Sequence, residues 1–211
     1  VISTEKGSVV IDFNGAVSEI NIDGENLLKA PLEPYFWKPE NDNQRAAGFA
    51  QRVASWEKAG EERKLKSIDV ASSKGKTTVK ASFSLPVGAD YDLTYSINAV
   101  GEIKVEADYR PSATDIPLIP KFGMRMRMPA DFASIEYYGR GPWENYPDRK
   151  SGYDISVYRM SLSDYQVDYV RPQDNGNRCD IRWFNLYSPD HKLCVKGCQP
   201  LCVRVWDYGE E

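Results

Sequence analysis

Histidine is nearly missing from this chain of 211 residues, since His191 is its only one. It lies in a Ser-Pro-Asp-His turn, so we expect neither a Ser-His-Asp nor a Cys-His catalytic system. The Gly-Lys-Thr sequence at residues 75–77 lacks the earlier glycine that a phosphate-binding loop requires. The cysteines lack the C-x2-C spacing of zinc sites. We therefore expect no metal site within this chain.

Long apolar runs and an excess of positive charge are also missing. No run of about 18 apolar residues exists, so we do not expect a membrane-spanning helix. The formal net charge is −4 without a basic block, so nucleic acid is not expected as a partner. The first residues include neither Met nor the features of a signal peptide, and we expect a fragment or a processed product. The sequence leaves bacterial cytoplasm and periplasm both open.

The cysteines are few, and their spacing does not form a recognisable site. Cys194, Cys198 and Cys202 are spaced four apart, which would place them on one side of a helix. Their segment contains Gly197 and Pro200 and is rich in valine, so it predicts two strands and a turn instead. Together with Cys179, they are expected to be ordinary buried or partly buried thiols. A disulfide framework is not implied at this chain length.

Alternation of apolar and polar residues is the main pattern that the chain does contain. Residues 8–13 and 16–22 alternate on either side of Asn14-Gly15, the strongest short signal for a β-hairpin. Similar alternation, separated by turn residues, recurs at residues 63–71, 76–86, 89–99, 102–109, 121–128, 155–162 and 179–187. Strands at this spacing indicate an antiparallel sandwich. We predict an all-β fold with one short helix at residues 48–58, where apolar residues recur at helical spacing.

Two segments before residue 130 carry candidate binding groups. Asn41, Asp42 and Asn43 follow a proline-rich stretch, where they form an Asx-rich turn or bind a hydroxyl or a cation; the turn is the default. Arg125 and Arg127 share the polar face of the predicted strand at residues 121–128. That face either meets solvent, which is the default, or lines a groove.

Residues 136–154 form the densest run of aromatic, glycine, proline and charged residues. Glycine and proline interrupt any helix here, and the run is too long for a hairpin turn. We predict an ordered loop held by its aromatic residues, with Trp143 and Glu144 near its centre. Aromatic faces beside carboxylates suit a sugar ligand. A self-packed structural loop with internal arginine–carboxylate pairs is the alternative.

A second Asn-Gly turn, at Asn175-Gly176, is followed closely by Arg178. Asn175 and Arg178 therefore join the residues of the loop at 136–154 as candidate site residues.

Four motifs resemble one known family in the same order. Residues 138–149 (YGRGPWENYPDR) resemble the signature of the C-terminal, or small-chain, domain of glycoside hydrolase family 2 β-galactosidases. Residues 36–43 (FWKPENDN), 53–60 (VASWEKAG) and 172–179 (PQDNGNRC) resemble three further motifs of that domain. The resemblance covers nearly the whole chain.

The resemblance implies a single antiparallel β-supersandwich over residues 1–211, of the galactose mutarotase-like type, as a fragment that lacks its last strands. It implies a parent enzyme that hydrolyses terminal non-reducing β-D-galactosides with retention. The two catalytic glutamates would belong to an upstream TIM barrel, the expected partner, so no catalytic residue is expected here. No cofactor is expected in this chain, although the parent family often uses Mg or Na ions bound elsewhere.

The predicted function is that of an accessory, structural domain that is inactive alone. The alternative is a stand-alone carbohydrate-binding module for a galactoside or another sugar. A mutarotase is a third hypothesis, but His191 does not match the mutarotase motif. The candidate substrate-binding residues are Asn41, Asp42, Asn43, Arg125, Arg127, Trp143, Glu144, Asn175 and Arg178.

We call the predicted loop at residues 136–154, which contains the family signature, the signature loop. If this loop serves packing, its aromatic and charged residues hold it in place. Trp143→Ala and Asp148→Ala are then expected to lower the melting temperature of the domain. Unchanged melting temperatures in both variants would indicate that the loop serves ligands or the neighbouring barrel instead.

Overall fold

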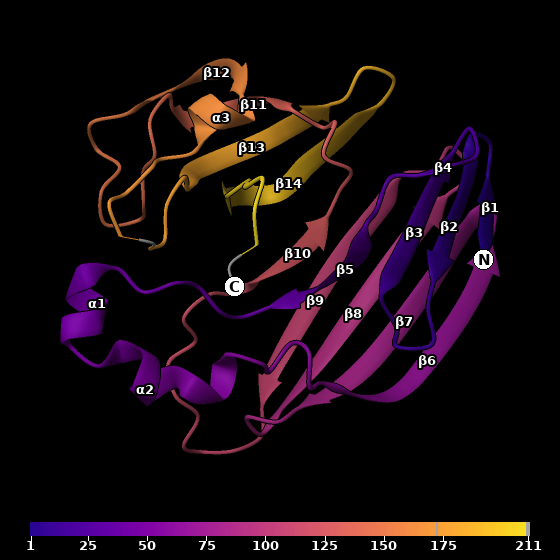
Figure 1. Ribbon diagram of the computed structural model, residues 1–211. Coiled ribbons are helices and arrows are strands. Elements are labelled where there is room, and N and C mark those ends of the chain that lie inside the picture. Colours follow the sequence, from indigo (N-terminus) through magenta and orange to yellow (C-terminus); the bar gives the residue numbers. More distant parts are fainter. Residues whose placement is uncertain (172, 210–211) are drawn as a thin grey trace. The chain divides into compact units, whose positions relative to one another are not determined.

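The computed structural model describes residues 1–171 and 173–209, and antiparallel β-sheets dominate it. The chain divides into two compact units (Figure 1). The first unit comprises Val1–Lys38 and Gly48–Pro129, and the second Pro39–Ala47 and Ala130–Glu211. The predicted all-β, antiparallel sandwich fold is confirmed. That residues 1–211 form a single β-supersandwich domain stays a prediction.

The first unit contains two sheets. One has the order β1-β2-β3-β5-β10, with β4 paired to β3, and the other has the order β6-β7-β8-β9. The strands of the first sheet are β1 (Ile2–Thr4), β2 (Gly7–Ile11), β3 (Val17–Ile22), β4 (Glu25–Asn26), β5 (Ala30–Tyr35) and β10 (Gly123–Arg127). Those of the second are β6 (Lys64–Ser73), β7 (Lys76–Leu85), β8 (Ala89–Asn98) and β9 (Ile103–Pro111). The predicted Asn14-Gly15 turn joins β2 to β3, with Gly15 at φ 72°.

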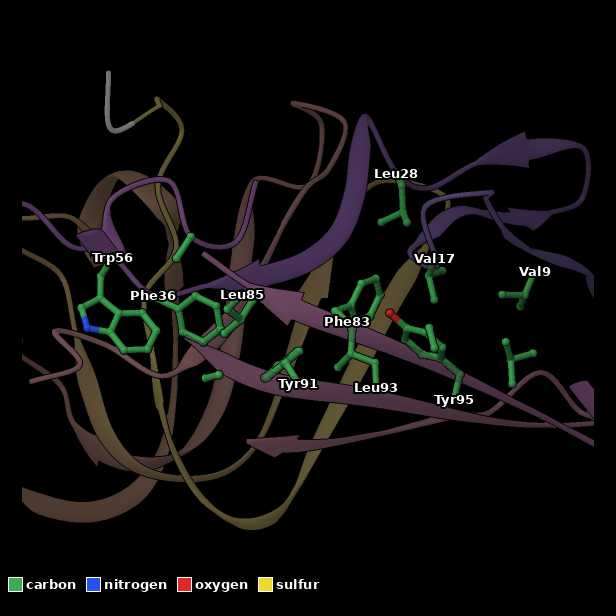
Figure 2. Packing of buried hydrophobic residues seen from close by; sticks show 14 of the residues in the cluster. Val9, Val17, Leu28, Phe36, Trp56, Phe83, Leu85, Tyr91, Leu93 and Tyr95 are labelled. Atoms are coloured by element: carbon green, nitrogen blue, oxygen red, sulfur yellow. The ribbon is translucent and has the colours of Figure 1, made fainter. Parts of the chain in front are cut away.

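The hydrophobic core of the first unit lies between its two sheets. Figure 2 shows Val9 and Val17 of the first sheet near Phe83, Leu93 and Tyr95 of the second. All five side chains are buried. Alternation along β7 and β8 places Phe83, Leu93 and Tyr95 on one face, as expected for strands with one buried face.

Trp56 extends this core beyond the strands. Its side chain is fully buried, its ring centroid lies 5.2 Å from that of Phe36, and its Nε1 donates to the carbonyl of Pro117 at 2.9 Å. The predicted helix at residues 48–58 is shorter than expected, because α2 (Phe49–Val53) continues as a 3-10 turn (Ala54–Trp56). This turn orients the indole so that its N–H reaches a carbonyl acceptor, as a buried tryptophan requires.

The chain forms more helices than the one predicted. Two further short helices, α1 (Asp42–Ala46) and α3 (Leu162–Tyr165), occur in the second unit. In the described part of the chain, no helix combines the length and the apolar character that crossing a bilayer requires.

The second unit is built on a four-stranded sheet with the order β12-β11-β13-β14. Its strands are β11 (Ser134–Gly141), β12 (Asp154–Ser161), β13 (Arg178–Tyr187) and β14 (Lys192–Val203), and α3 contacts β12 (Figure 1). The prediction of two strands and a turn around Gly197 and Pro200 is wrong. Register shifts in the pairing with β13 absorb these residues, so that β14 is one continuous strand.

The predicted loop at residues 136–154 is shorter than expected, because β11 runs through Gly141. A Cβ at Gly139 would lie 2.7 Å from Cγ1 of Ile181, and one at Gly141 would lie 2.9 Å from the ring of Tyr158. Both glycines therefore permit close packing at a strand, and the loop proper comprises residues 142–153.

We predict that Trp56→Ala lowers the free energy of unfolding by about 3–5 kcal/mol, because it empties a fully buried site and removes a hydrogen bond. The matched control is Phe13→Ala, since Phe13 is 97% exposed, and its effect should stay within about 0.5 kcal/mol. Urea unfolding, followed by the far-ultraviolet circular dichroism of the backbone, measures the free energy of unfolding of both variants. Equal stability of the two variants would contradict this assignment of the core.

Candidate functional site

Arg178, at the start of β13, is a buried cation with a 1% exposed side chain. Its Nε and Nη2 both donate to the carbonyl of Pro142, at 3.1 and 2.9 Å. Its Nη1 donates to the carbonyls of Tyr165 and Gly176, at 2.9 and 3.0 Å. One guanidinium thus joins the loop of residues 142–153, the end of α3 and the turn that precedes β13.

An aromatic surface supports this guanidinium. The centre of the Arg178 guanidinium lies 4.0 Å from the ring centroid of Tyr165, a cation–π arrangement. Burial raises the pKa of Tyr165, and burial likewise raises that of Tyr137. Both phenols therefore remain neutral donors, Tyr165 to the carbonyl of Val203 at 2.9 Å and Tyr137 to that of Pro142 at 3.3 Å.

Glu144 is the buried carboxylate of the same loop, 6% exposed. Its Oε1 accepts from Nη2 of Arg149 at 2.7 Å and from the hydroxyl of Tyr169. Its Oε2 accepts from the backbone N–H of Gly176 at 2.9 Å. Both carboxylate oxygens therefore have protein donors, as a buried charge requires.

Asn145 is a buried polar residue of the loop that the sequence reasoning did not single out. Its side chain is fully buried, its Nδ2 donates to the carbonyls of Arg140 and Trp143, and its Oδ1 accepts from the N–H of Cys179 at 2.9 Å. The backbone groups of Asn145 bond Asn177 in both directions, at 2.8 and 2.7 Å. The available signal was its central position in the motif at residues 138–149.

Asn175 lies in the predicted Asn-Gly turn, which is confirmed by the φ of 71° at Gly176. Asn175 is 5% exposed, its Nδ2 donates to the hydroxyl of Tyr208 at 3.0 Å, and its Oδ1 accepts from Nε1 of Trp206 at 3.1 Å. The turn therefore holds the segment that follows β14. Pro172, the first residue of the motif at residues 172–179, lies outside the described residues.

We call the side chains of Glu144, Asn145, Asn175, Asn177 and Arg178 the Arg178 network. Three of the predicted site residues, Glu144, Asn175 and Arg178, belong to it. Their polar atoms form hydrogen bonds with other groups of the protein. These hydrogen bonds hold the loop of residues 142–153 against the turn of residues 173–177.

Trp143 and Asp148 do not hold the loop. Trp143 is 68% exposed, and Asp148 is exposed and has no hydrogen bond among the described residues. The expectation that their replacement by alanine destabilises the domain therefore finds no support in the structure. The predicted internal ties do exist at Arg149, which pairs with Glu144, and at Arg140, which pairs with Asp180 and donates to the carbonyl of Tyr153.

The residues Asn41, Asp42 and Asn43 begin a helix instead of forming only a turn. Asn41 and Gln44 form a capping box at the start of α1, with distances of 2.8 and 3.2 Å. Asp42 pairs with Arg45 at 2.9 Å and lies 3.9 Å from Arg171, while Asn43 is exposed. Of the three predicted residues, only Asp42 borders an open hollow of about 660 Å³ within the second unit, together with Arg45 and Arg171.

Arg125 and Arg127 belong to β10 in the first unit. Arg125 donates to Glu33 at 2.9 Å and to Glu61 at 2.8 Å, and it lies over the ring of Tyr35. Arg127 is exposed, and its carbonyl accepts from the N–H of Lys29. That Arg125 and Arg127 line a groove stays a prediction.

The described residues contain no group of three or more His, Cys, Asp and Glu side chains that is placed to hold a metal ion. The interactions that the structure does show at the candidate site are internal ion pairs and hydrogen bonds around one loop.

Fold and site together define an antiparallel β-sandwich protein whose second unit is organised around a polar loop. The family model described as "Beta galactosidase small chain" matches residues 4–211. The chain belongs to this β-galactosidase small-chain family, which confirms the resemblance.

Curated relatives agree with the family. The chain is 38% identical to a β-galactosidase of Lactobacillus delbrueckii subsp. bulgaricus over 78% of its own length and 16% of the relative's. It is 34% identical to a β-galactosidase of Priestia megaterium over 92% of its own length and 19% of the relative's. The chain thus spans less than a fifth of the curated relatives it matches.

We predict that Glu144→Gln lowers the free energy of unfolding by about 2 kcal/mol, because an amide nitrogen replaces an acceptor oxygen among donors. Asp148→Ala, in the same loop, is the matched control and should stay within about 0.5 kcal/mol. Chemical unfolding measures both. A Glu144 variant as stable as the control would show that the carboxylate does not hold the loop.

Proposed function

We propose that this chain is the accessory C-terminal region of a β-galactosidase that hydrolyses terminal non-reducing β-D-galactosides, and that it is inactive alone. The observation that carries the proposal is the extent of the match. Nearly the whole chain matches the small-chain family, yet it corresponds to only 16% and 19% of the two relatives described above. Most of each relative therefore lies outside the matched region.

The charges of the loop support an accessory role. A retaining glycosidase requires two carboxyl groups about 5–5.5 Å apart, one of which acts as a nucleophile. Glu144, the buried carboxylate of the loop, instead accepts hydrogen bonds at both oxygens from groups of its own unit. This supports the assignment of the catalytic glutamates to another part of the parent protein, a catalytic barrel that is the proposed partner of this chain.

A stand-alone carbohydrate-binding module is the second candidate function. One observation favours it: Trp143 is 68% exposed beside a buried polar network, and exposed aromatic rings bind sugar C–H faces. Calorimetric titration of galactose and lactose into the chain tests it. Binding that Trp143→Ala removes would support a module, and silence at millimolar sugar would contradict it.

The proposed function predicts activity only in combination with the rest of the enzyme. The chain alone should leave a nitrophenyl β-galactoside unhydrolysed, and the same chain joined to the remaining polypeptide of a matched β-galactosidase should restore hydrolysis. The matched control is the remaining polypeptide without this chain, which should hydrolyse the substrate at least about tenfold more slowly. Turnover by the chain alone would contradict the claim of inactivity, and full activity of the control would contradict the accessory role.

A further inference from the structure

Two cysteines face each other across the β13–β14 pair. Arg178 pairs with Val203 in the register, so Cys179 and Cys202, their neighbours in the chain, lie on adjacent strands. Their Sγ atoms are 3.4 Å apart. A disulfide S–S bond measures about 2.05 Å, so the sulfurs need to approach by only about 1.4 Å.

The two thiols differ in access to solvent. Cys179 is 2% exposed, whereas Cys202 is exposed, as are Cys194 and Cys198. The expectation that all four are buried or partly buried is therefore wrong for three of them. The backbone N–H of Cys179 donates to Oδ1 of Asn145 at 2.9 Å, so the buried cysteine is tied to the loop of residues 142–153.

The surroundings favour the thiolate at Cys202. The hydrogen bond with Cys179 lowers the pKa of Cys202 to about 7, although partial desolvation of its sulfur opposes this effect. The hydrogen bond to Cys202 and burial both raise the pKa of Cys179. An exposed thiolate beside a buried thiol is the arrangement of an attacking and a resolving cysteine.

We propose that Cys179 and Cys202 form a redox-active pair, in which a low-molecular-weight disulfide modifies Cys202 first and Cys179 resolves the adduct to an intramolecular disulfide. The Cys202 thiolate attacks one sulfur of the reagent, forms a mixed disulfide and releases one reagent thiolate. Cys179 then loses its proton to solvent, attacks Sγ of Cys202 and releases the second thiolate. Two protein thiols are oxidised to one disulfide while one reagent disulfide is reduced to two thiols.

The disulfide would act on the signature loop. Cys179 contacts Asn145 through its N–H and through Sγ, at 2.9 and 3.6 Å, and its Sγ accepts from Asn177 at 3.3 Å. Movement of this sulfur toward Cys202 changes the two contacts that Sγ makes. Oxidation at the sheet is therefore coupled to the Arg178 network.

The test uses the full chain with Cys194→Ser and Cys198→Ser, so that only the pair remains, and oxidised glutathione as the probe. We expect the mass of the chain to fall by two hydrogen atoms, thiols titrated in denaturant to fall from two to none, and a tryptic peptide linked through Cys179 and Cys202. Dithiothreitol should reverse all three changes.

Two single variants in this background separate the steps. Cys179→Ala should stop at a stable glutathionyl adduct on Cys202, and Cys202→Ser should leave Cys179 unmodified because it is buried. Cys202→Ser replaces an exposed side chain, so its folding can be verified by circular dichroism. Retention of both thiols in the background chain, an adduct that never resolves, or a linkage only between chains would each overturn the proposal.

Discussion

The second unit depends on the hydrogen bonding of one buried cation. Transfer of a guanidinium out of water is costly unless acceptors bond its N–H groups and nearby negative charge or dipoles offset its positive charge. Among the described residues, Arg178 has no carboxylate as a hydrogen-bond partner; four bonds to three backbone carbonyls and the face of Tyr165 compensate it instead. Since these carbonyls come from three separate segments, the cation can be buried only when all three are in place. The geometry of the loop at residues 142–153 follows from this requirement.

The other buried polar groups extend the same constraint. Glu144 bonds the N–H of Gly176, Asn145 bonds the N–H of Cys179, and Asn175 bonds Trp206. Glu144 and Asn145 supply acceptors to buried backbone N–H groups, and Asn175 accepts from the indole of Trp206 through both its side chain and its carbonyl. Such a network loses stability when any one member is removed, because its partners are left unsatisfied. The first unit is stabilised differently, by an apolar core between two sheets.

The division between these two kinds of stabilisation explains what the sequence could predict. Period-2 alternation and Asn-Gly turns are local signals, so most strands and both turns were found close to their observed bounds. The continuity of β14 was not predicted, because pairing with β13 overrides the local Gly and Pro signals through register shifts. Gly139 and Gly141 indicated a loop, but they serve close packing inside the sheet, which depends on Ile181 and Tyr158 far along the chain.

The site was predictable in its residue types but not in its geometry. Glu144, Asn175 and Arg178 were identified as candidates, yet each has a partner that lies far along the chain, as Pro142 does for Arg178. Composition also could not show that Trp143 lies outside the packed loop while Asn145 lies inside it. Family resemblance supplied the identity of the domain, whereas the structure supplied the physical role of its signature.

The central claim is that internal hydrogen bonds hold the signature loop as firmly as the sheet beneath it. Hydrogen–deuterium exchange at the backbone amides of Asn145, Gly176 and Cys179 tests this claim most directly, because each donates to a group of the Arg178 network or to its backbone. The account predicts that these amides exchange as slowly as the paired amides of β11 and β13. Exchange as fast as that of the exposed amide of Asp148 would contradict it.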